Sequence, residues 1–187
     1  LRSRQQSLRN EVLKSRTAVV AWQLKVRKNH EEIQRMEATS KTLEKLSFED
    51  PLTGLANRRR FTEIVPGLLS QGLARGRPPF VALIDIDQFK QINDRFSHQV
   101  GDQVLQWIAQ ILKSHLREGD MPARLAGDEF VLAFGHADAF DVEQVCKRIQ
   151  AAVQNFDWAS IQDGLQVTIS VGFAQAHAGD SVETLTH

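Results

Sequence analysis

The first 48 residues place apolar side chains at a seven-residue repeat. Counting from Leu8 as a d position, the a positions are Val12, Val19, Val26, Ile33 and Ser40, and the d positions are Leu8, Ser15, Trp22, Asn29, Met36 and Leu43. This alternating four–three spacing predicts a coiled coil, and β-branched residues at a favour two parallel strands. The alternative is one amphipathic helix packed on another domain. In a homodimer, Asn29 would pair with its own copy in the seam.

After residue 48 the pattern changes to helical and strand segments in alternation. Pro51 disfavours helix at the preceding residue and so ends the first segment. The apolar spacing predicts helices over 57–69, 88–96, 101–116 and 141–156, strands over 80–86, 123–125, 130–134 and 165–174, and a loop at 72–79. Such alternation predicts an α/β sheet covered by helices. We therefore expect a coiled-coil helix at 1–48 and an α/β domain at 49–187.

Composition and charge exclude several classes of protein. Lys+Arg and Asp+Glu both number 23, so nothing predicts long-range attraction to nucleic acid or to an anionic membrane. No apolar run approaches the roughly 18–20 residues that span a bilayer, so we expect no membrane segment in this chain. A start at Leu1, with neither Met nor a signal peptide, suggests a piece of a larger sensor or membrane-anchored protein.

The single cysteine, Cys146, excludes an intramolecular disulfide and indicates a reducing, cytoplasmic compartment. It lies in an apolar-periodic stretch with Val142, Val145 and Ile149. We interpret it as a small core residue rather than a reactive thiol.

Two acidic pairs are the candidate chemistry. Asp85 and Asp87 end an apolar strand, and Asp128 and Glu129 lie on a turn between two short strands. If the strands are neighbours, the carboxylates converge, and burying them together is costly unless a cation neutralises them. Mg²⁺ binds few protein carboxylates and takes water and phosphate oxygens besides, which suits phosphoryl or nucleotidyl transfer. Taken alone, Asp85 and Asp87 are more often a solvated strand end or helix cap, and Asp128 and Glu129 are more often an ordinary surface turn.

Five motifs, in order, give the chain a resemblance to a known family. They are DPLTGLANRR at 50–59, DIDQFKQIND at 85–94, HQVGD at 98–102, RLAGDEF at 124–130 and VTISVG at 167–172. Together they resemble the GGDEF domains of diguanylate cyclases. The resemblance implies a palm-like nucleotidyl-cyclase fold with a mixed, mainly antiparallel sheet flanked by helices. It also implies that a dimer condenses two GTP molecules to cyclic di-GMP, with loss of pyrophosphate.

The resemblance implies a role for each acidic residue. Asp85, the main-chain carbonyl of Ile86 and Asp128 would bind Mg²⁺, with Mn²⁺ as a substitute. Asp128 is also the family's usual candidate for the base that activates the 3′-hydroxyl group. Glu129 would share the catalytic cluster or bind the metal.

The implied substrate-binding residues are Asn93, His98, Asp102, Phe89, Lys90 and Gly127. Asn93 and Asp102 would recognise guanine, because its N1–H and N2 donors suit a carboxylate and an amide both donates and accepts. Backbone amides at Phe89 and Lys90 would cradle phosphates at a helix start. Gly127 would let the main chain approach the nucleotide closely.

A second ligand site is implied by Arg117 and Asp120. They match the family's inhibitory-site pattern, Arg-x-x-Asp, at its spacing from the signature, and Arg148 matches a second arginine in some members. A planar guanidinium suits a guanine or a phosphate of bound cyclic di-GMP. The alternative is an ordinary helix end, with Arg117 complementing the dipole and Gly119 stopping the helix.

Three positions depart from the family pattern. Ala126 stands for the first signature glycine and Ser97 for the glycine before His98, and the chain stops at His187, before the family's basic final helix. An alanine at 126 is tolerated if its φ is negative and costly if φ is positive. The alternatives to an active cyclase are a catalytically impaired receptor for cyclic di-GMP or GTP and a purely structural dimerisation module. The retained acidic set argues against the last.

Overall fold

The computed structural model describes residues 27–28, 30, 32–36, 47–135, 137–177, 179–180 and 182–185. The chain divides into two units, 1–45 and 46–187. Most of the predicted coiled coil lies outside the described residues. Its described positions are helical, and the side chains of Ile33 and Met36 are 53% and 61% exposed. Within the described ranges, no helix is both long enough and apolar enough to cross a membrane.

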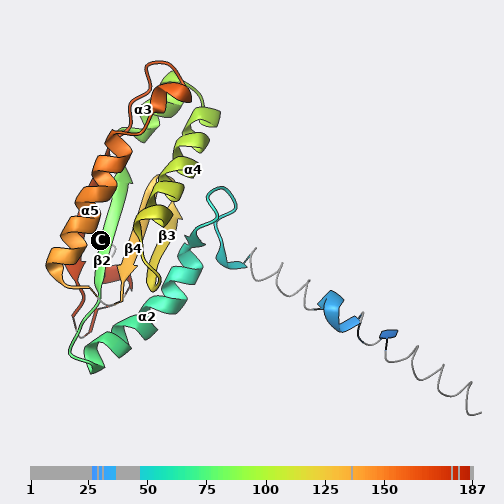
Figure 1. Ribbon diagram of the computed structural model, residues 1–187, viewed down its shortest axis with the longest axis vertical. Helices are drawn as coiled ribbons and strands as arrows, with labels where there is room; N and C mark the ends of the chain where they lie inside the picture. The colour runs from blue at the N-terminus through green and yellow to red at the C-terminus, as the bar shows by residue number, and fades with distance from the viewer. Residues whose placement is uncertain are drawn as a thin grey trace, which may run out of the picture. The chain divides into compact units, whose positions relative to one another are not determined.

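The second unit is built on one five-stranded sheet (Figure 1). In chain order the elements are β1 (Ala56–Asn57), α2 (Arg58–Ala74), β2 (Phe80–Ile86), α3 (Phe89–Arg95), α4 (His98–His115), β3 (Asp120–Ala126), β4 (Glu129–Phe134), α5 (Ala139–Gln154), a 3₁₀ turn (Trp158–Ser160), β5 (Ile169–Gln175) and α6 (Val182–Leu185). The strand order is β1-β3-β4-β2-β5, and only the β1–β3 pair is parallel. The predicted mixed, mainly antiparallel, palm-like sheet flanked by helices is confirmed.

Both faces of the sheet are covered, which explains the apolar run Phe80–Ile84 of β2. Successive strand residues point to opposite faces. Ile84 and Phe130 join the core beneath α4 and α5, which lie over one face in Figure 1. Val81, three positions before Ile84, and Val131, next to Phe130, join the core beneath α2. The acidic residues at the ends of β2 and β4 are thereby held on strands fixed from both sides.

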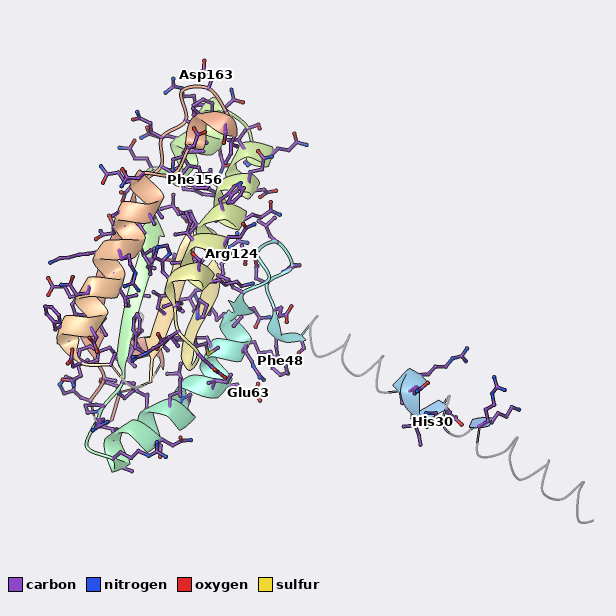
Figure 2. All side chains as sticks on the ribbon, in the orientation of Figure 1. His30, Phe48, Glu63, Arg124, Phe156 and Asp163 are labelled. Carbon is purple, nitrogen blue, oxygen red and sulfur yellow. The ribbon has the colours of Figure 1, made fainter. Side chains whose placement is uncertain are left out.

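An aromatic cluster lies beyond the C-terminal end of α5. The ring of Phe156, labelled in Figure 2, lies 4.8 Å from Trp107 of α4 and 4.6 Å from Trp158, between ring centroids. The indole of Trp158 donates to the carbonyl of Val153 at 2.8 Å. These contacts tie the segment before β5 to the helical layer.

Several predicted boundaries were wrong. Helix α2 continues to Ala74 instead of ending near residue 69. Gly72 is buried inside this helix, and a Cβ at this position would lie 2.7 Å from the Arg77 carbonyl oxygen. Helix α4 begins at His98, since the Ser97 side chain accepts from the Val100 N–H. β3 is longer than predicted, and β5 starts at Ile169 rather than 165.

Candidate functional site

Carboxylates from two strands meet at one end of the sheet. The antiparallel register of β2 and β4 sets Asp85 directly opposite Glu129, and Asp128 lies in the turn just before β4. Burial, together with the neighbouring carboxylates of Asp128, Glu129 and Asp87, raises the pKa of Asp85 above its ordinary value. The predicted convergence of the two acidic pairs is present in the structure, and the ionised cluster repels itself.

The donor set fits a hard cation. Carboxylates of Asp85 and Asp128 and the main-chain carbonyl of Ile86, the last residue of β2, are oxygen ligands of the type that Mg²⁺ and Mn²⁺ accept. Among the described residues, no three His, Cys, Asp or Glu side chains are grouped to hold a metal by themselves. A cation here would complete its shell with water or phosphate oxygens, which is the habit of Mg²⁺.

Asp87, the second carboxylate of the motif, makes hydrogen bonds to the segment of β5. Its carboxylate accepts from the hydroxyls of Thr168 at 2.5 Å and Ser170 at 2.6 Å, and its N–H donates to the Thr168 carbonyl at 3.0 Å. Asp87 therefore ties the end of β2 to β5. No role was predicted for either hydroxyl, although both lie in the VTISVG motif.

The predicted guanine-binding residues lie where α3 packs on α4. A Cβ at Gly101 would fall 2.0 Å from Asn93 Oδ1 and 3.3 Å from Phe89 Cζ, so both side chains lie directly against the Gly101 backbone. Asp102 is the next residue, exposed on α4, and His98 is the exposed first residue of that helix. The structure thus places the Asn93 amide against Gly101, the residue before Asp102, in a contact that requires glycine.

The start of α3 adjoins the acidic cluster. Gln88, which precedes the helix, has the left-handed φ of 57° and makes no side-chain cap, and Lys90 is exposed. A cavity of about 640 Å³ lies beside Asp85. Its lining residues are Asp85, Asp87, Gln88, Gln91, Ile92, Arg95, Phe96, Gly164, Gln166 and Thr168. None of the predicted guanine-binding residues lines this cavity.

The signature turn shows which of the family's two glycine positions requires glycine. Gly127 has a φ of 49°, in the left-handed region that favours glycine. Gln88 and Ser97 are the non-glycine residues with positive φ in the described part of the chain, and Ala126 is not among them. The methyl group of Ala126 is therefore tolerated, on a strand end where the β3–β4 register shifts after Arg124.

Ser97 occupies a backbone conformation suited to the glycine it replaces. Its φ of 151° and ψ of 164° lie in a region populated almost only by glycine, at a cost of about 1–3 kcal/mol. Its hydroxyl offsets part of that cost by capping α4 at Val100. This substitution, rather than Ala126, is the strained departure from the family pattern.

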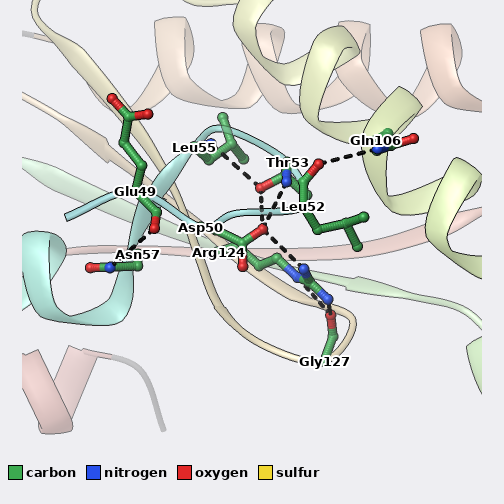
Figure 3. A network of polar contacts seen from close by, with 9 residues as sticks. All are labelled: Glu49, Asp50, Leu52, Thr53, Leu55, Asn57, Gln106, Arg124 and Gly127. Carbon is green, nitrogen blue, oxygen red and sulfur yellow. Dashed lines mark hydrogen bonds and ion pairs between the residues drawn. The ribbon is translucent and has the colours of Figure 1, made fainter. Parts of the chain in front are cut away.

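A network that the sequence analysis missed joins the first turn of the domain to the signature turn (Figure 3). Arg124 donates from Nε and Nη2 to the Gly127 carbonyl oxygen at 2.9 and 2.7 Å, and from Nη1 to Asp50 Oδ1 at 3.0 Å. The same Asp50 oxygen accepts from the N–H and hydroxyl of Thr53 at 2.9 and 2.7 Å. Burial raises the pKa of Asp50, but the hydrogen bonds from Thr53 and Arg124 outweigh it and hold the pKa below its ordinary value.

Comparison with known proteins identifies this arrangement. Residues 47–187 match the family described as "Diguanylate cyclase, GGDEF domain". The chain belongs to the GGDEF family. The response regulator PleD of Caulobacter vibrioides is 41% identical over 143 residues, which are 75% of this chain and 32% of that protein. The diguanylate cyclase DgcM of Escherichia coli is 35% identical over 143 residues, 76% of this chain and 34% of that one. The chain therefore spans about a third of these relatives' length.

Solved structures give the same GGDEF fold. The coiled coil and GGDEF domain of DgcB from Caulobacter crescentus, in complex with c-di-GMP, has a TM-score of 0.79 at 26% identity and covers 87% of each chain. The diguanylate cyclase SiaD of Pseudomonas aeruginosa, in complex with its activator SiaC, has a TM-score of 0.69 at 30% identity, covering 98% of this chain and 80% of that one.

A second cavity of the GGDEF domain, of about 240 Å³, is lined by the residues predicted as an inhibitory site, Arg117, Asp120 and Arg148. Arg117 Nε lies 3.6 Å from Asp120 Oδ2, and Arg148 Nη2 donates to the His115 carbonyl at 3.0 Å. The alternative of an ordinary helix end fails in one respect, because α4 ends at His115, before Arg117, and Gly119 has its φ of 97° in the turn that follows. The three residues are gathered at one hollow.

Proposed function

We propose that this GGDEF domain is a Mg²⁺-dependent diguanylate cyclase that condenses two GTP molecules to cyclic di-GMP. The 3′-hydroxyl of one GTP attacks the α-phosphate of the other, a phosphodiester bond forms, and pyrophosphate leaves. The same step with the roles exchanged closes the ring. The observation that carries the proposal is the register that sets Asp85 opposite Glu129, with Asp128 in the adjoining turn.

The chain's own residues divide the work of this reaction. Asp85, Asp128 and the Ile86 carbonyl would hold Mg²⁺, or Mn²⁺, which supplies positive charge to the phosphate oxygens. Asp128 is our candidate to accept the proton of the 3′-hydroxyl, and Glu129 adds to the negative cluster. Backbone amides at Phe89 and Lys90 would bind phosphate at the start of α3, with the Lys90 ammonium adding charge.

Guanine would be selected by the α3–α4 pair. Asp102 can accept from N1–H and N2–H₂, and the Asn93 amide can donate to and accept from the base edge. Adenine lacks that pair of donors, so GTP would be preferred over ATP. His98, one turn before Asp102 on the same helix, would flank the base.

Product formation from GTP tests the proposal. The dimeric protein with GTP and Mg²⁺ is expected to yield cyclic di-GMP and pyrophosphate, and Asp128→Ala to reduce the rate at least about 10²-fold. Glu63→Ala, which removes an exposed acid on α2, is the matched control and keeps wild-type turnover. Absence of product from the wild-type dimer, with GTP binding intact, would exclude cyclase activity.

A homodimer through the N-terminal coiled coil would bring the two GTP-loaded domains together. Ile33 and Met36, at a and d positions, are exposed in the single chain. This exposure supports the assembly, because a second helix covers the apolar a and d residues of a coiled coil. Sedimentation equilibrium is expected to give a dimer for the wild type and a monomer for Ile33→Asp. We assign the reaction to the cytoplasm, where GTP is available and the free Cys146 stays reduced.

The second cavity supports product inhibition and also a second candidate function, a receptor for cyclic di-GMP. Arg117 and Arg148 supply two guanidinium groups and Asp120 a carboxylate around one hollow, which suits a guanine and its phosphate. Arg117→Ala is expected to abolish inhibition by added cyclic di-GMP without lowering the initial rate. Calorimetric binding of cyclic di-GMP by a wild-type protein that makes no product would select the receptor.

A further inference from the structure

The conformation of the signature turn depends on one carbonyl group. Gly127 and Asp128 alone connect β3 to β4. The peptide unit that joins them contains the Gly127 carbonyl, so its orientation sets the backbone from which the Asp128 carboxylate projects. Gly127 has a φ of 49°, nothing lies within 4 Å of the position that a Cβ would take, and glycine has no side chain whose packing could hold that peptide.

The Arg124 guanidinium holds this carbonyl with two nitrogens. Nε and Nη2 both lie within 2.9 Å of the Gly127 oxygen, and the rigid planar fork fixes the direction of approach. The fork is prevented from rotating by its third nitrogen, which donates to Asp50. Asp50 is itself fixed by two donors from Thr53, and Asn57 fixes the segment before it by donating to the carbonyls of Ser47 and Glu49.

We propose that Arg124 is a positioning residue for the nucleotidyl-transfer site, and that Asp50 orients Arg124. The guanidinium sets the Gly127–Asp128 peptide and so the direction of the Asp128 carboxylate. This inference rests on the proposed function only for its effect on turnover. Its effect on the backbone of the turn stands independently of what the site catalyses.

The network contributes to the turn rather than to the core. The β3–β4 hairpin is already held by backbone pairing, from the pair Asp120–Phe134 to the pair Ala126–Glu129, and by buried side chains on both faces. The side chains of Arg124 and Asp50 are 13% and 19% exposed and lie outside both hydrophobic clusters. Loss of the guanidinium therefore frees the turn before it affects folding.

Arg124→Gln, Arg124→Lys and Asp50→Asn test the proposal, with Lys113→Ala as the matched control. Lys113 also donates to a carbonyl of the first turn, that of Gly54, at 2.8 Å, and among the described residues it has no hydrogen bond or ion pair with the signature turn. The first readout is amide hydrogen exchange at residues 127–129 in metal-free protein. We expect exchange to be at least ~10-fold faster in Arg124→Gln, partly restored in Arg124→Lys, and unchanged in Lys113→Ala.

The second readout separates positioning from substrate binding. In Arg124→Gln we expect kcat to fall on the order of 10²-fold with little change in the KM for GTP, because the predicted guanine contacts lie on α3 and α4. Asp50→Asn is expected to change kcat less, since its amide oxygen still accepts from Arg124. If Arg124→Gln does not fold, Arg124→Lys against Lys113→Ala decides the question by the same measurements.

Unchanged exchange of the turn in Arg124→Gln would overturn the proposal, as would a loss confined to KM or to melting temperature. If the wild type makes no cyclic di-GMP, the proposed function fails and the exchange measurement alone decides the positioning role.

Discussion

Gly101→Ala should separate substrate binding from stability, because the new methyl group would collide with the end of the Asn93 side chain and make a close contact with Phe89. Its carbon would lie 2.0 Å from Asn93 Oδ1 and 3.0 Å from Asn93 Cγ, far inside contact distance. Rotation of the Asn93 side chain would relieve this clash, so we expect the fold to survive while the amide leaves its place against Gly101. Alanine in place of glycine in a helix contributes up to ~1 kcal/mol, which offsets the cost of moving Asn93.

The magnitude follows from the contacts that guanine loses. An amide that no longer reaches the base removes one or two hydrogen bonds, each contributing roughly 0.5–1.5 kcal/mol, so the KM for GTP should rise on the order of 10-fold. Steady-state kinetics with GTP and a thermal unfolding curve measure both effects. We expect the melting temperature to change by no more than a few degrees.

Gly67→Ala is the matched control. Gly67 lies in α2 with nothing within 4 Å of its Cβ position, so the Gly67→Ala protein should be more stable than wild type by up to ~1 kcal/mol and keep the wild-type kinetics. A wild-type KM in Gly101→Ala would refute the assignment of Asn93 to guanine. A large loss of stability would refute the argument that only a mobile side-chain end is displaced.

Three further predictions concern strain, charge and burial. Ser97→Gly should be at least as stable as wild type in urea unfolding, because it relieves ~1–3 kcal/mol of backbone strain, whereas Ser97→Ala should lose the cap and cost ~1 kcal/mol; equal losses would contradict the strain. The pKa of Asp85 is raised in the folded protein, so its ionisation opposes folding as pH rises from 3.8 through the folded-state value. Asp85→Asn should therefore raise the melting temperature of the metal-free protein at pH 7, and raise it less near pH 4. The same substitution should abolish turnover. Burial raises the pKa of Cys146 to about 11, so iodoacetamide should label the native thiol at pH 8 far more slowly than the unfolded one.

The fold was largely predictable because its apolar patterns are local. The segment Phe80–Ile86 was predicted as β2 to the residue, because its apolar run Phe80–Ile84 is typical of a strand buried on both faces. The boundaries that were wrong depend on contacts distant in sequence or on side-chain caps. Gly72, which looked like the start of a loop, is helical because the following turn folds back onto it, and α4 gained a turn because Ser97 caps it.

The acidic residues of the site could be predicted from the sequence, but the residues that hydrogen-bond to them and to the signature turn could not. Motif order was enough to select Asp85, Asp128 and Glu129, and the strand register brought them together. The Asp50–Arg124 pair spans 74 positions, and neither residue type indicates its partner. Asp87 was noted as a carboxylate, but its hydroxyl donors come from a strand 81 and 83 positions away. Roles of individual site residues remain predictions that the experiments above test.

The unequal backbone geometry of the two residues before Asp128 has a consequence for recognising related proteins. Position 126 is exposed at a strand end and has no positive φ, so its backbone does not require glycine, whereas position 127 has a left-handed conformation. A search pattern that demands glycine at both positions discards chains whose hairpin is intact. A pattern that keeps glycine at the second position and adds an arginine two residues before the first would retain these chains. It would reject hairpins that have the acidic residues but lack the arginine that contacts the turn.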